Sequence, residues 1–227
     1  MTPRESKLWY FNQFNMINSL KPEQRERMSD VSNMLVRPAG ETIYFEHDIS
    51  DKIFFLKKGK IKLSRYAEDG RELILSILGK GEIFGELGLV EEGNRDETAV
   101  VLEDAVICSV SLDEFKQLMQ ENPAFNLSVT KLIGLRFKKI KSRMENLVFK
   151  DTRGRICTFI KDLVDEFGKE IGLYEKEVKL HLTHEDIAKL TATTRQTVTS
   201  ILNKLEKEGL ISYDRKRILV HEYDKLV

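Results

Sequence analysis

The chain contains little cysteine, little histidine and no long apolar run. Its 227 residues include 2 cysteines and 4 histidines. No stretch approaches the roughly 18 consecutive apolar residues that a membrane-spanning helix needs. The polar residues 1–7 lead into a short apolar segment that Asn12 interrupts, which is unlike a secretory signal. We therefore expect a cytoplasmic protein that does not associate with membranes.

The cysteines and histidines are scattered along the chain. Cys108 and Cys157 lie in separate apolar segments, and two isolated cysteines cannot hold an iron–sulfur cluster or form a disulfide framework. We interpret both as buried thiols. The histidines are His47, His181, His184 and His221. Their wide spacing predicts surface side chains rather than a metal site.

The sequence has no excess of either charge. It contains 37 Lys and Arg residues and 37 Asp and Glu residues, and the two kinds are also equally numerous within residues 151–227. A nucleic-acid-binding surface would therefore depend on local clusters of basic side chains rather than on net charge. With 41% hydrophobic and 33% charged residues, the composition is that of a globular protein with room for two domains.

The most informative pattern lies at Thr183–Leu205, which predicts two short helices joined by a tight turn. Thr183 with Asp186 predicts a capping box at the first helix, and Thr193 with Gln196 predicts a similar start for the second. This arrangement is typical of a helix-turn-helix, whose second helix enters the major groove of DNA.

Polar side chains are predicted to face outward from the second helix, where they would offer donors and acceptors to base edges and phosphates. They are Thr194, Arg195, Gln196, Thr197, Thr199, Ser200, Asn203 and Lys204. The small Ala188 and Ala192 would let the two helices cross closely. Pairs of amphipathic helices with a polar face also occur in proteins that bind no DNA.

The residues after the second helix favour DNA binding. Gly209 is predicted to end this helix, and strands at 210–213 and 218–221 would form a two-stranded wing around a basic turn. Such a turn, beside a recognition helix, contacts the flanking DNA backbone. The predicted DNA-binding residues therefore also include Arg215, Lys216 and Arg217.

Residues 36–111 show short β-rich runs separated by glycines, which suggests a jelly-roll-type barrel. The predicted strands are 53–56, 61–63, 73–78 and 98–102. Residues 6–35 before the barrel have a helical pattern. Helical structure is predicted to resume at Ser111, where Glu114 completes a capping box.

A long helix is predicted from Asn122 and Pro123 to about residue 147. Five of its apolar residues are spaced alternately four and three apart, as in a coiled-coil seam: Ile133, Phe137, Ile140, Met144 and Leu147. The stripe could instead pack on the barrel. The many basic residues elsewhere on this helix favour a dimer helix. Residues 149–151 are predicted to be a hinge, with Asp151 capping the next helix.

Four short stretches resemble the CRP/FNR family of bacterial transcription regulators, in the family's order and across almost the whole chain. They are Gly81–Gly88, Glu145–Phe149, Thr152–Ile156 and Thr194–Val198. The resemblance implies a cyclic-nucleotide-binding-like barrel, a long dimerisation helix and a C-terminal winged helix-turn-helix. It further implies a homodimer that binds double-stranded DNA at a palindromic site and acts with RNA polymerase.

We therefore predict an α+β fold in three parts. Residues 1–122 would form an effector-sensing jelly-roll β-barrel domain with flanking helices. Residues 123–150 would form the dimerisation helix and hinge, and residues 151–227 the winged helix-turn-helix domain. Effector binding in the barrel would reorient the recognition helices through the hinge.

The resemblance also implies an effector loop. In the cyclic-AMP-responsive members, backbone N–H groups in the loop hold the cyclic phosphate, the glutamate bonds the ribose and an arginine pairs with the phosphate. Glu86 and Arg95 match these two side chains. Asp96 stands where the family has Ser or Thr, and Ile140 and Lys141 replace hydroxyl residues that meet adenine. The candidate effector-binding residues are Gly85, Glu86, Leu87, Arg95, Asp96, Ile140 and Lys141.

Because half of the cyclic-AMP contact set is missing, another small effector or anion, and the loss of ligand control, remain alternatives. Haem-sensing members need an axial ligand just after the loop, where residues 87–90 offer none, so we expect no haem. In the recognition helix, Arg195, Gln196 and Ser200 match the main base-reading positions. Arginine suits guanine, and glutamine, where the family more often has glutamate, suits adenine.

Two other functions are open at this point. The chain could be a cyclic-nucleotide or small-molecule binding module whose C-terminal helices contact proteins. Similar barrels also occur in metal enzymes, which need clustered His and Glu ligands on neighbouring strands, but His47 is alone in this barrel. We therefore expect no enzyme activity.

Overall fold

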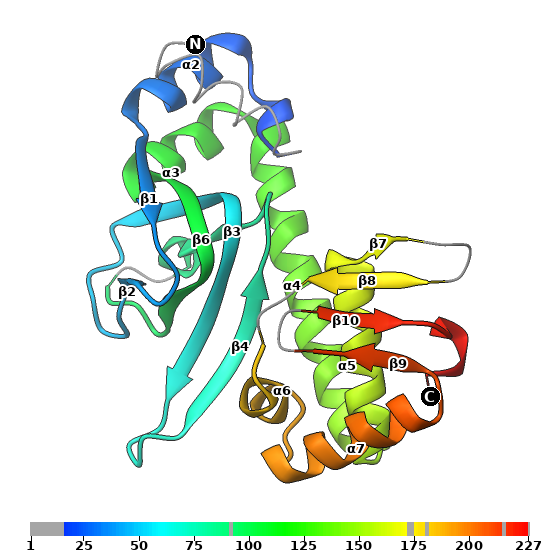
Figure 1. Cartoon of the computed structure of the whole chain (residues 1–227). Helices are drawn as coiled ribbons and strands as arrows, with labels where there is room; N and C mark the ends of the chain where they lie inside the picture. The colour runs from blue at the N-terminus through cyan, green and yellow to red at the C-terminus, as the bar shows by residue number, and fades with distance from the viewer. Residues whose placement is uncertain (1–15, 91–92, 172–174, 180–181, 215–216, 227) are drawn as a thin grey trace. The chain divides into compact units, whose positions relative to one another are not determined.

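The computed structural model describes residues 16–90, 93–171, 175–179, 182–214 and 217–226. The chain divides into two compact units, and the main boundary between them falls within a long helix, after Phe137. The short stretch Glu72–Ile74 groups with the second unit. The first unit is built on an antiparallel sheet with flanking helices, and the second on helices and a smaller sheet (Figure 1). The fold is α+β, as predicted.

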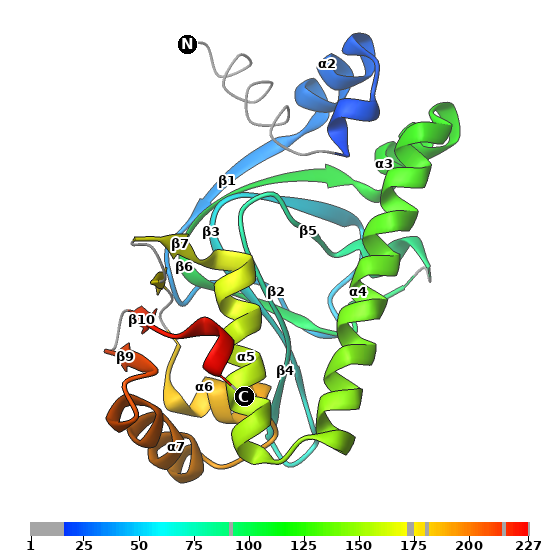
Figure 2. The same ribbon diagram turned by 90° about the vertical axis from the view of Figure 1, so that its right-hand side faces the viewer.

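The first unit is the predicted jelly-roll-type barrel, with strands that curve around its interior (Figure 2). In the described residues its strands pair in the order β1-β6-β3-β4, while β2 joins β6 and β5 joins β3. The strands are β1 Asn33–Arg37, β2 Thr42–Tyr44, β3 Lys52–Tyr66, β4 Glu72–Leu78, β5 Ile83–Phe84 and β6 Thr98–Ser111.

The structure has one long strand, β3, where the sequence predicts two. Gly59 lies between the predicted strands and has φ +88°. It sits in an irregular part of the β3–β6 pairing, where a Cβ atom would lie 2.5 Å from the backbone oxygens of Glu103 and Asp104. The glycine therefore lets the strand continue past a close backbone contact rather than turn. Strand β6 likewise runs beyond residue 102, to Ser111.

The helical prediction for residues 6–35 is correct only in part. Residues 6–15 lie outside the described residues, and helices η1 (Ile17–Ser19) and α2 (Pro22–Val31) follow them. Residues 33–35 are wrongly predicted, because they belong to β1, which pairs with β6 from Asn33↔Ser109 to Arg37↔Ala105. These residues form a strand because they pair with the edge of β6, and local propensity does not reveal such a distant partner.

Helices α3 (Leu112–Glu121) and α4 (Pro123–Phe149) begin where the sequence predicts. The Ser111 hydroxyl accepts a hydrogen bond from Glu114 N at 3.3 Å, and the Asn122 side chain accepts one from Phe125 N at 3.0 Å. A shared core joins these helices to the sheet, with fully buried members Ile53, Phe55, Cys108, Phe115, Leu118 and Phe125.

The second unit contains α5 (Thr152–Phe167), α6 (His184–Leu190) and α7 (Arg195–Lys207), with the short helix η3 (Tyr223–Lys225) near its end. Its sheet has the order β7-β8-β10-β9, with β7 Lys169–Glu170, β8 Lys176–Lys179, β9 Ile211–Tyr213 and β10 Arg217–Val220. Asp151 caps α5 by accepting from Gly154 N at 2.7 Å, as predicted. Cys157 on this helix is buried, like Cys108.

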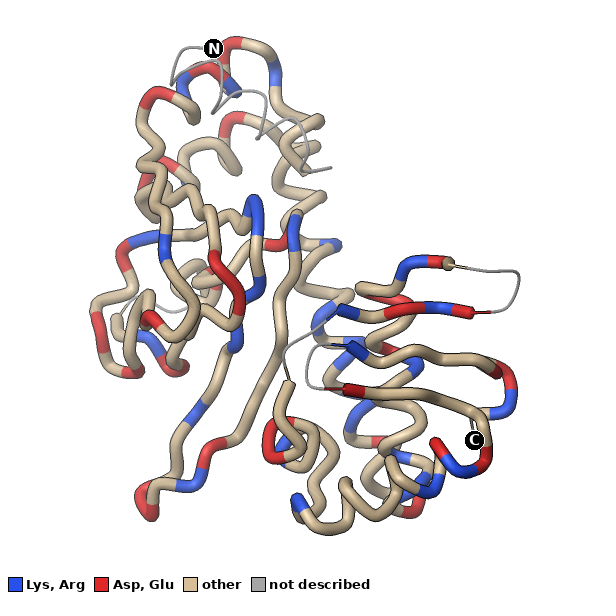
Figure 3. Tube along the Cα trace, viewed as in Figure 1, with Lys and Arg blue, Asp and Glu red and all other residues tan. Residues whose placement is uncertain are grey.

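The predicted wing corresponds to β9 and β10, to within one residue at each end. Strands β7 and β8 are not predicted from the sequence, because both are short and rich in lysine and glutamate. Acidic and basic residues are mixed along both units (Figure 3). Within the described ranges, no helix is long and apolar enough to cross a membrane, and no group of three His, Cys, Asp or Glu side chains could hold a metal ion.

Candidate DNA-binding surface and effector site

Helix α6 begins at the capping box that the sequence predicts. The Thr183 hydroxyl oxygen accepts from Asp186 N at 3.1 Å, and Thr183 N donates to the Asp186 carboxylate at 2.9 Å. Ile187 and Ala188 of α6 and Val198 of α7 are buried, and the two helices are in contact. The helix-turn-helix is therefore held by its own apolar faces.

The start of α7 differs from the prediction. Thr194 is the N-cap, since its hydroxyl oxygen accepts from Thr197 N at 3.2 Å and bonds the Thr197 hydroxyl at 2.8 Å. The predicted pair of Thr193 with Gln196 is wrong, because Thr193 still belongs to the turn and its N–H donates to Ala188 O at 3.0 Å. The hydroxyls of Thr194 and Thr197 are thus both hydrogen-bonded within the first turn of α7.

The turn between α6 and α7 is held by Arg155. Ala192 lies in this turn with φ +51° and is exposed, so it is not at the helix crossing as predicted. Arg155 Nε donates to Thr191 O at 2.9 Å, Nη2 to Ala192 O at 3.2 Å and Nη1 to Lys150 O at 3.2 Å. One guanidinium therefore links the segment after α4 to the turn before α7.

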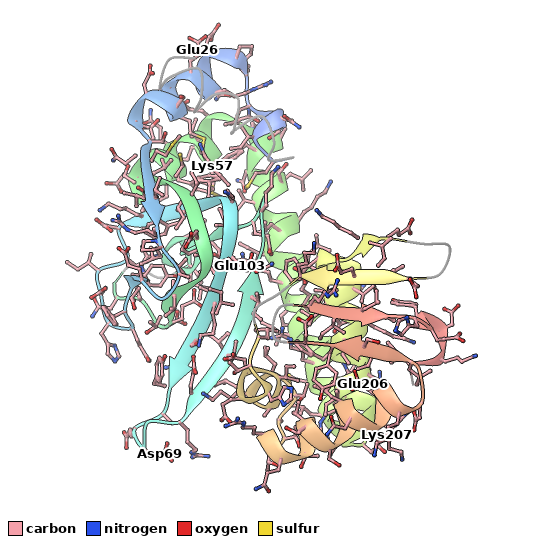
Figure 4. All side chains as sticks on the ribbon, in the orientation of Figure 1. Glu26, Lys57, Asp69, Glu103, Glu206 and Lys207 are labelled. Carbon is pink, nitrogen blue, oxygen red and sulfur yellow. The ribbon has the colours of Figure 1, made fainter. Side chains whose placement is uncertain are left out.

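The outer face of α7 is polar and open. An open groove on it is lined by Arg195, Gln196, Thr199, Ser200 and Asn203. Arg195, Gln196 and Ser200 are exposed, and no described residue forms an ion pair with Arg195. Lys204 is exposed further along the helix, which ends in the charged turn that holds Glu206 and Lys207 (Figure 4). The predicted base-reading side chains are thus accessible.

Two polar residues of α7 are held by neighbouring elements. The half-buried Thr199 donates its hydroxyl to Arg195 O at 2.9 Å, and the same oxygen lies 2.8 Å from His184 Nδ1. Tyr213 OH donates to Asn203 Oδ1 at 2.7 Å. His184 and Tyr213 come from α6 and β9, so the periodicity of α7 could not have identified them.

The wing is described in part. Arg215 and Lys216 lie outside the described residues, whereas Arg217 is exposed at the start of β10. Arg217 Nη1 lies 3.0 Å from the Glu177 carboxylate, and its Nε lies 3.2 Å from that of Asp214. A DNA phosphate near Arg217 would compete with these two carboxylates for the guanidinium.

Strand β5 leads into the loop that resembles a phosphate-binding segment. Gly85 has φ +77°, and a Cβ atom there would lie 2.6 Å from Arg95 Nη1, so this close approach requires glycine. Helix η2 (Glu86–Leu89) follows, with Glu86 buried and Leu87 44% exposed. The structure thus brings Gly85, Glu86 and Arg95 together, while the side chains of Leu87 and Asp96 are exposed.

The Arg95 guanidinium is buried and already engaged. Nη1 donates to Gly85 O at 2.9 Å and Nη2 to Lys52 O at 2.6 Å, while the guanidinium carbon lies 4.5 Å from the centre of the Tyr44 ring. Its Nε is buried without a hydrogen-bond partner. A ligand anion would therefore compete with two backbone carbonyls for this side chain.

Arg136 on α4 is a site residue that the sequence analysis missed. Its guanidinium donates to the Glu86 carboxylate and to Ile83 O. The other carboxylate oxygen of Glu86, Oε2, is buried without a partner. Arg136 is one of the basic residues of this helix that lie outside the apolar stripe. Its spacing of seven from Arg143, which is also half-buried, was the available indication that one side of α4 faces neighbouring elements.

Glu97 is a second buried acid of this cluster that the sequence analysis missed. Tyr44 OH donates to Glu97 Oε1 at 2.9 Å, and both side chains are buried. Burial raises the pKa of Glu97 to about 7; the Tyr44 hydrogen bond opposes this rise, and the negative charges of Glu86 and Asp96 add to it. The cluster therefore contains an acid that can change protonation near neutral pH.

The apolar seam of α4 is exposed along its whole length. The exposed fractions of its five residues run from 39% for Ile133 to 69% for Phe137. Ile140 and Lys141, which were predicted to line the effector site, are also exposed, and Lys141 Nζ lies 3.8 Å from the Glu145 carboxylate. Five large apolar side chains on one stripe of a helix form a surface that favours a partner.

Comparisons with known proteins agree with these features. The model of the cyclic nucleotide-binding domain matches residues 35–122, and the model of the Crp-like helix-turn-helix domain matches residues 154–227. A global nitrogen regulator from Synechocystis sp. is 31% identical over 80% of this chain and 81% of its own. A CRP-like cAMP-activated global transcriptional regulator from Mycobacterium tuberculosis is 28% identical over 83% of this chain and 84% of its own.

A solved structure supports the same assignment. A CooA variant from Carboxydothermus hydrogenoformans superposes with a TM-score of 0.72, at 26% identity, over 87% of each chain. The cyclic nucleotide-binding match thus covers most of the barrel, and the Crp-like match covers the helix-turn-helix. The chain belongs to the CRP/FNR family of DNA-binding transcription regulators.

Proposed function

We propose that this regulator acts as a homodimer, reads a palindromic DNA site with α7 and is controlled by a small effector bound in its barrel. The observation that carries the proposal is the polar, open face of α7, presented by two capped helices whose apolar faces are buried. Such a face offers side chains to base edges without unfolding any part of the domain.

The proposed base readers are Arg195, Gln196 and Ser200. Arg195 can form two parallel hydrogen bonds to guanine O6 and N7, and Gln196 can bond adenine in the same way. We propose phosphate contacts for Thr194, Thr197, Lys204 and the wing residues Arg215, Lys216 and Arg217. The hydroxyls of Thr194 and Thr197 bond each other, and only one of them donates in this bond. The other hydroxyl keeps a proton that it can donate to a phosphate oxygen at the start of α7.

The proposed dimer forms through the α4 seam. Its residues are Ile133, Phe137, Ile140, Met144 and Leu147, all exposed in the single chain. Their alternating spacing of four and three matches knobs-into-holes packing between two parallel helices. A twofold axis along the seam would present two copies of α7, and an inverted DNA repeat mirrors that symmetry.

The proposed effector site is the buried cluster around Gly85. Glu86 Oε2 and Arg95 Nε are buried polar atoms without partners, and a bound ligand could satisfy both. A cyclic nucleotide or another small anion fits an arginine beside a loop of backbone N–H groups. The effector would act through Arg136, because this residue joins Glu86 to α4. RNA polymerase is the further partner that we propose for a regulator of transcription.

Selection from random duplex DNA tests the proposed reading mode. We expect the selected sites to be inverted repeats whose half-sites lie about one helical turn apart. Light scattering of the complex should give two chains for each duplex. Asymmetric selected sequences, or one chain for each duplex, would contradict the proposed dimer, and a lack of any enriched sequence would contradict base reading.

The substitution Arg195→Ala is expected to weaken binding to the selected site by about 1–3 kcal/mol, the usual value of one bidentate contact. Binding to random DNA should change much less. Lys207→Ala is a matched control, because it removes one positive charge from the other end of α7. Fluorescence anisotropy with both duplexes measures the difference. An equal loss on specific and random DNA would show that Arg195 contacts the backbone instead.

A further inference from the structure

We propose that His184 is a proton-linked contact to the DNA backbone, whose imidazole binds a phosphate oxygen and takes up one proton from solvent when the duplex binds. The inference rests on the proposed function, since it requires the α7 face to lie against DNA. It adds a residue of α6 that no pattern on the recognition helix assigns.

The hydrogen bonds of His184 define its free nitrogen. Its Nδ1 lies 2.8 Å from Thr199 Oγ1, and that hydroxyl donates its one proton to Arg195 O at 2.9 Å. With the Thr199 proton in that bond, the imidazole is the donor to Thr199, and we assign the hydrogen of the neutral ring to Nδ1 on this basis. Nε2 is then the nitrogen that can take a further proton. Tyr213 orients the ring, with a distance of 5.6 Å between ring centroids.

The charges around His184 favour an added anion. Arg195 on α7 is the positive group that acts on His184, and no described residue forms an ion pair with Arg195. Glu185 and Asp186 lie on His184's own helix, and the Asp186 carboxylate is bonded to Thr183. Tyr213 is the facing group on β9. Burial and, to a lesser extent, Arg195 lower the pKa of His184 in the free protein.

A DNA phosphate would raise the pKa of His184, which burial and Arg195 lower in the free protein. Its negative charge would stabilise the imidazolium, because an opposite charge within a few ångströms favours the charged form of a base. Thr199 would remain the ring's fixed partner, since Nδ1 donates to it in both protonation states. The role of Thr199, which the sequence analysis placed among the DNA contacts, is then to position His184.

The test measures binding of the whole protein to random-sequence duplex DNA at about pH 6 and pH 8, each over a series of salt concentrations. We expect the affinity to rise by about three- to tenfold per subunit at the lower pH, because a rise of one pKa unit on binding changes the affinity by at most tenfold. The dependence of log K on log salt should become steeper by about 0.9 per subunit, since each subunit neutralises one more phosphate.

Two variants separate His184 from other titrating groups. In His184→Asn the amide can still donate to Thr199, but nothing titrates, so both pH effects should disappear. His184→Lys carries a fixed charge and should bind at about pH 8 as tightly as the unchanged protein does at about pH 6. His221→Asn is the control, because both ring nitrogens of His221 are already hydrogen-bonded, to Ser212 and Glu175. This substitution should leave the pH effects unchanged.

The outcomes are distinct. Pronounced pH dependence that survives in His184→Asn, or equal affinity of the unchanged protein at both pH values, would overturn the proposal for His184 while leaving DNA binding intact. Absence of DNA binding by the unchanged protein at either pH would instead overturn the proposed function. Thermal melting of both variants shows that they fold.

Discussion

A glutamate in place of Ile140 is expected to leave the protein monomeric at micromolar concentration and to weaken binding to a palindromic site by about 100- to 10,000-fold. Ile140 is the middle residue of the α4 seam and is 55% exposed in the single chain. In the proposed dimer, two carboxylates would be buried beside each other without partners, which a coiled-coil seam does not tolerate. Loss of the dimer removes the second half-site and its effective concentration.

Size-exclusion chromatography with light scattering measures the state of the protein, and gel shifts on the selected palindrome measure its affinity. Ser142→Glu is the matched control. It adds the same charge at an exposed position two residues further along α4, which turns it to the other side of the helix. This control should remain dimeric. An Ile140→Glu protein that stays dimeric would place the interface elsewhere.

The second large effect concerns the buried acid of the barrel. Glu97→Gln is expected to stabilise the barrel at about pH 8 by up to about 3 kcal/mol and to have little effect below pH 4.5. Glutamine keeps a side-chain oxygen that can accept the Tyr44 hydrogen bond, but it carries no charge to bury. Urea denaturation of both proteins over a pH series measures the difference.

The direction follows from the raised pKa of Glu97, about 7 in the folded protein against an ordinary value of 4.5. Below pH 4.5 the side chain is protonated in both the folded and the unfolded state, and the stabilising effect of the protonated form is fully present. Between pH 4.5 and about 7 the unfolded chain has released this proton while the folded protein still holds it, so the wild-type free energy of unfolding falls as the pH rises. Above about pH 7 the folded protein holds a buried carboxylate.

The substitution Tyr44→Phe provides a complementary measurement. It removes the hydrogen bond that lowers the pKa of Glu97, so the loss of stability with rising pH should become larger than in the wild type. Parallel stability curves for the wild-type and Glu97→Gln proteins would show that Glu97 does not titrate in this range, and would thereby contradict the proposed cause.

Features that depend on a few neighbouring residues could be predicted from the sequence. Asp151, Ser111 and Thr183 all cap the helices expected of them, because a cap needs only a side-chain oxygen and the N–H group two or three residues later. The start of α7 was placed one residue early, since Thr193 and Thr194 offer the same hydroxyl. Only the backbone of the turn selects between them.

Strand boundaries were predicted less well. β3 continues through Gly59, and β1 forms where a helix was expected, because each strand is completed by pairing with the distant β6. The energy of a strand comes mainly from its cross-strand neighbours, which a local window of sequence does not contain. For the same reason, the charged strands β7 and β8 gave no sequence pattern.

The candidate sites show the same division. Arg195, Gln196 and Ser200 are exposed where helical periodicity placed them. In contrast, Arg136 and Glu97 looked like ordinary charged residues of a helix and a loop. They belong to the effector cluster only because α4 meets η2 at Glu86 and the residue before β6 meets β2 at Tyr44.

The amino-acid sequence alone determined the family, the starts of most helices, the capping box of α6 and the apolar seam of α4. The caps and the seam follow from spacings of three, four or seven residues, and the family follows from four short stretches of sequence. The tertiary structure decided which polar side chains contact one another, as with Glu86 and Arg136, Tyr44 and Glu97, or His184 and Thr199. The physical reason is that burial and hydrogen bonding act between residues brought together by the whole fold, so their energies do not follow from local spacing.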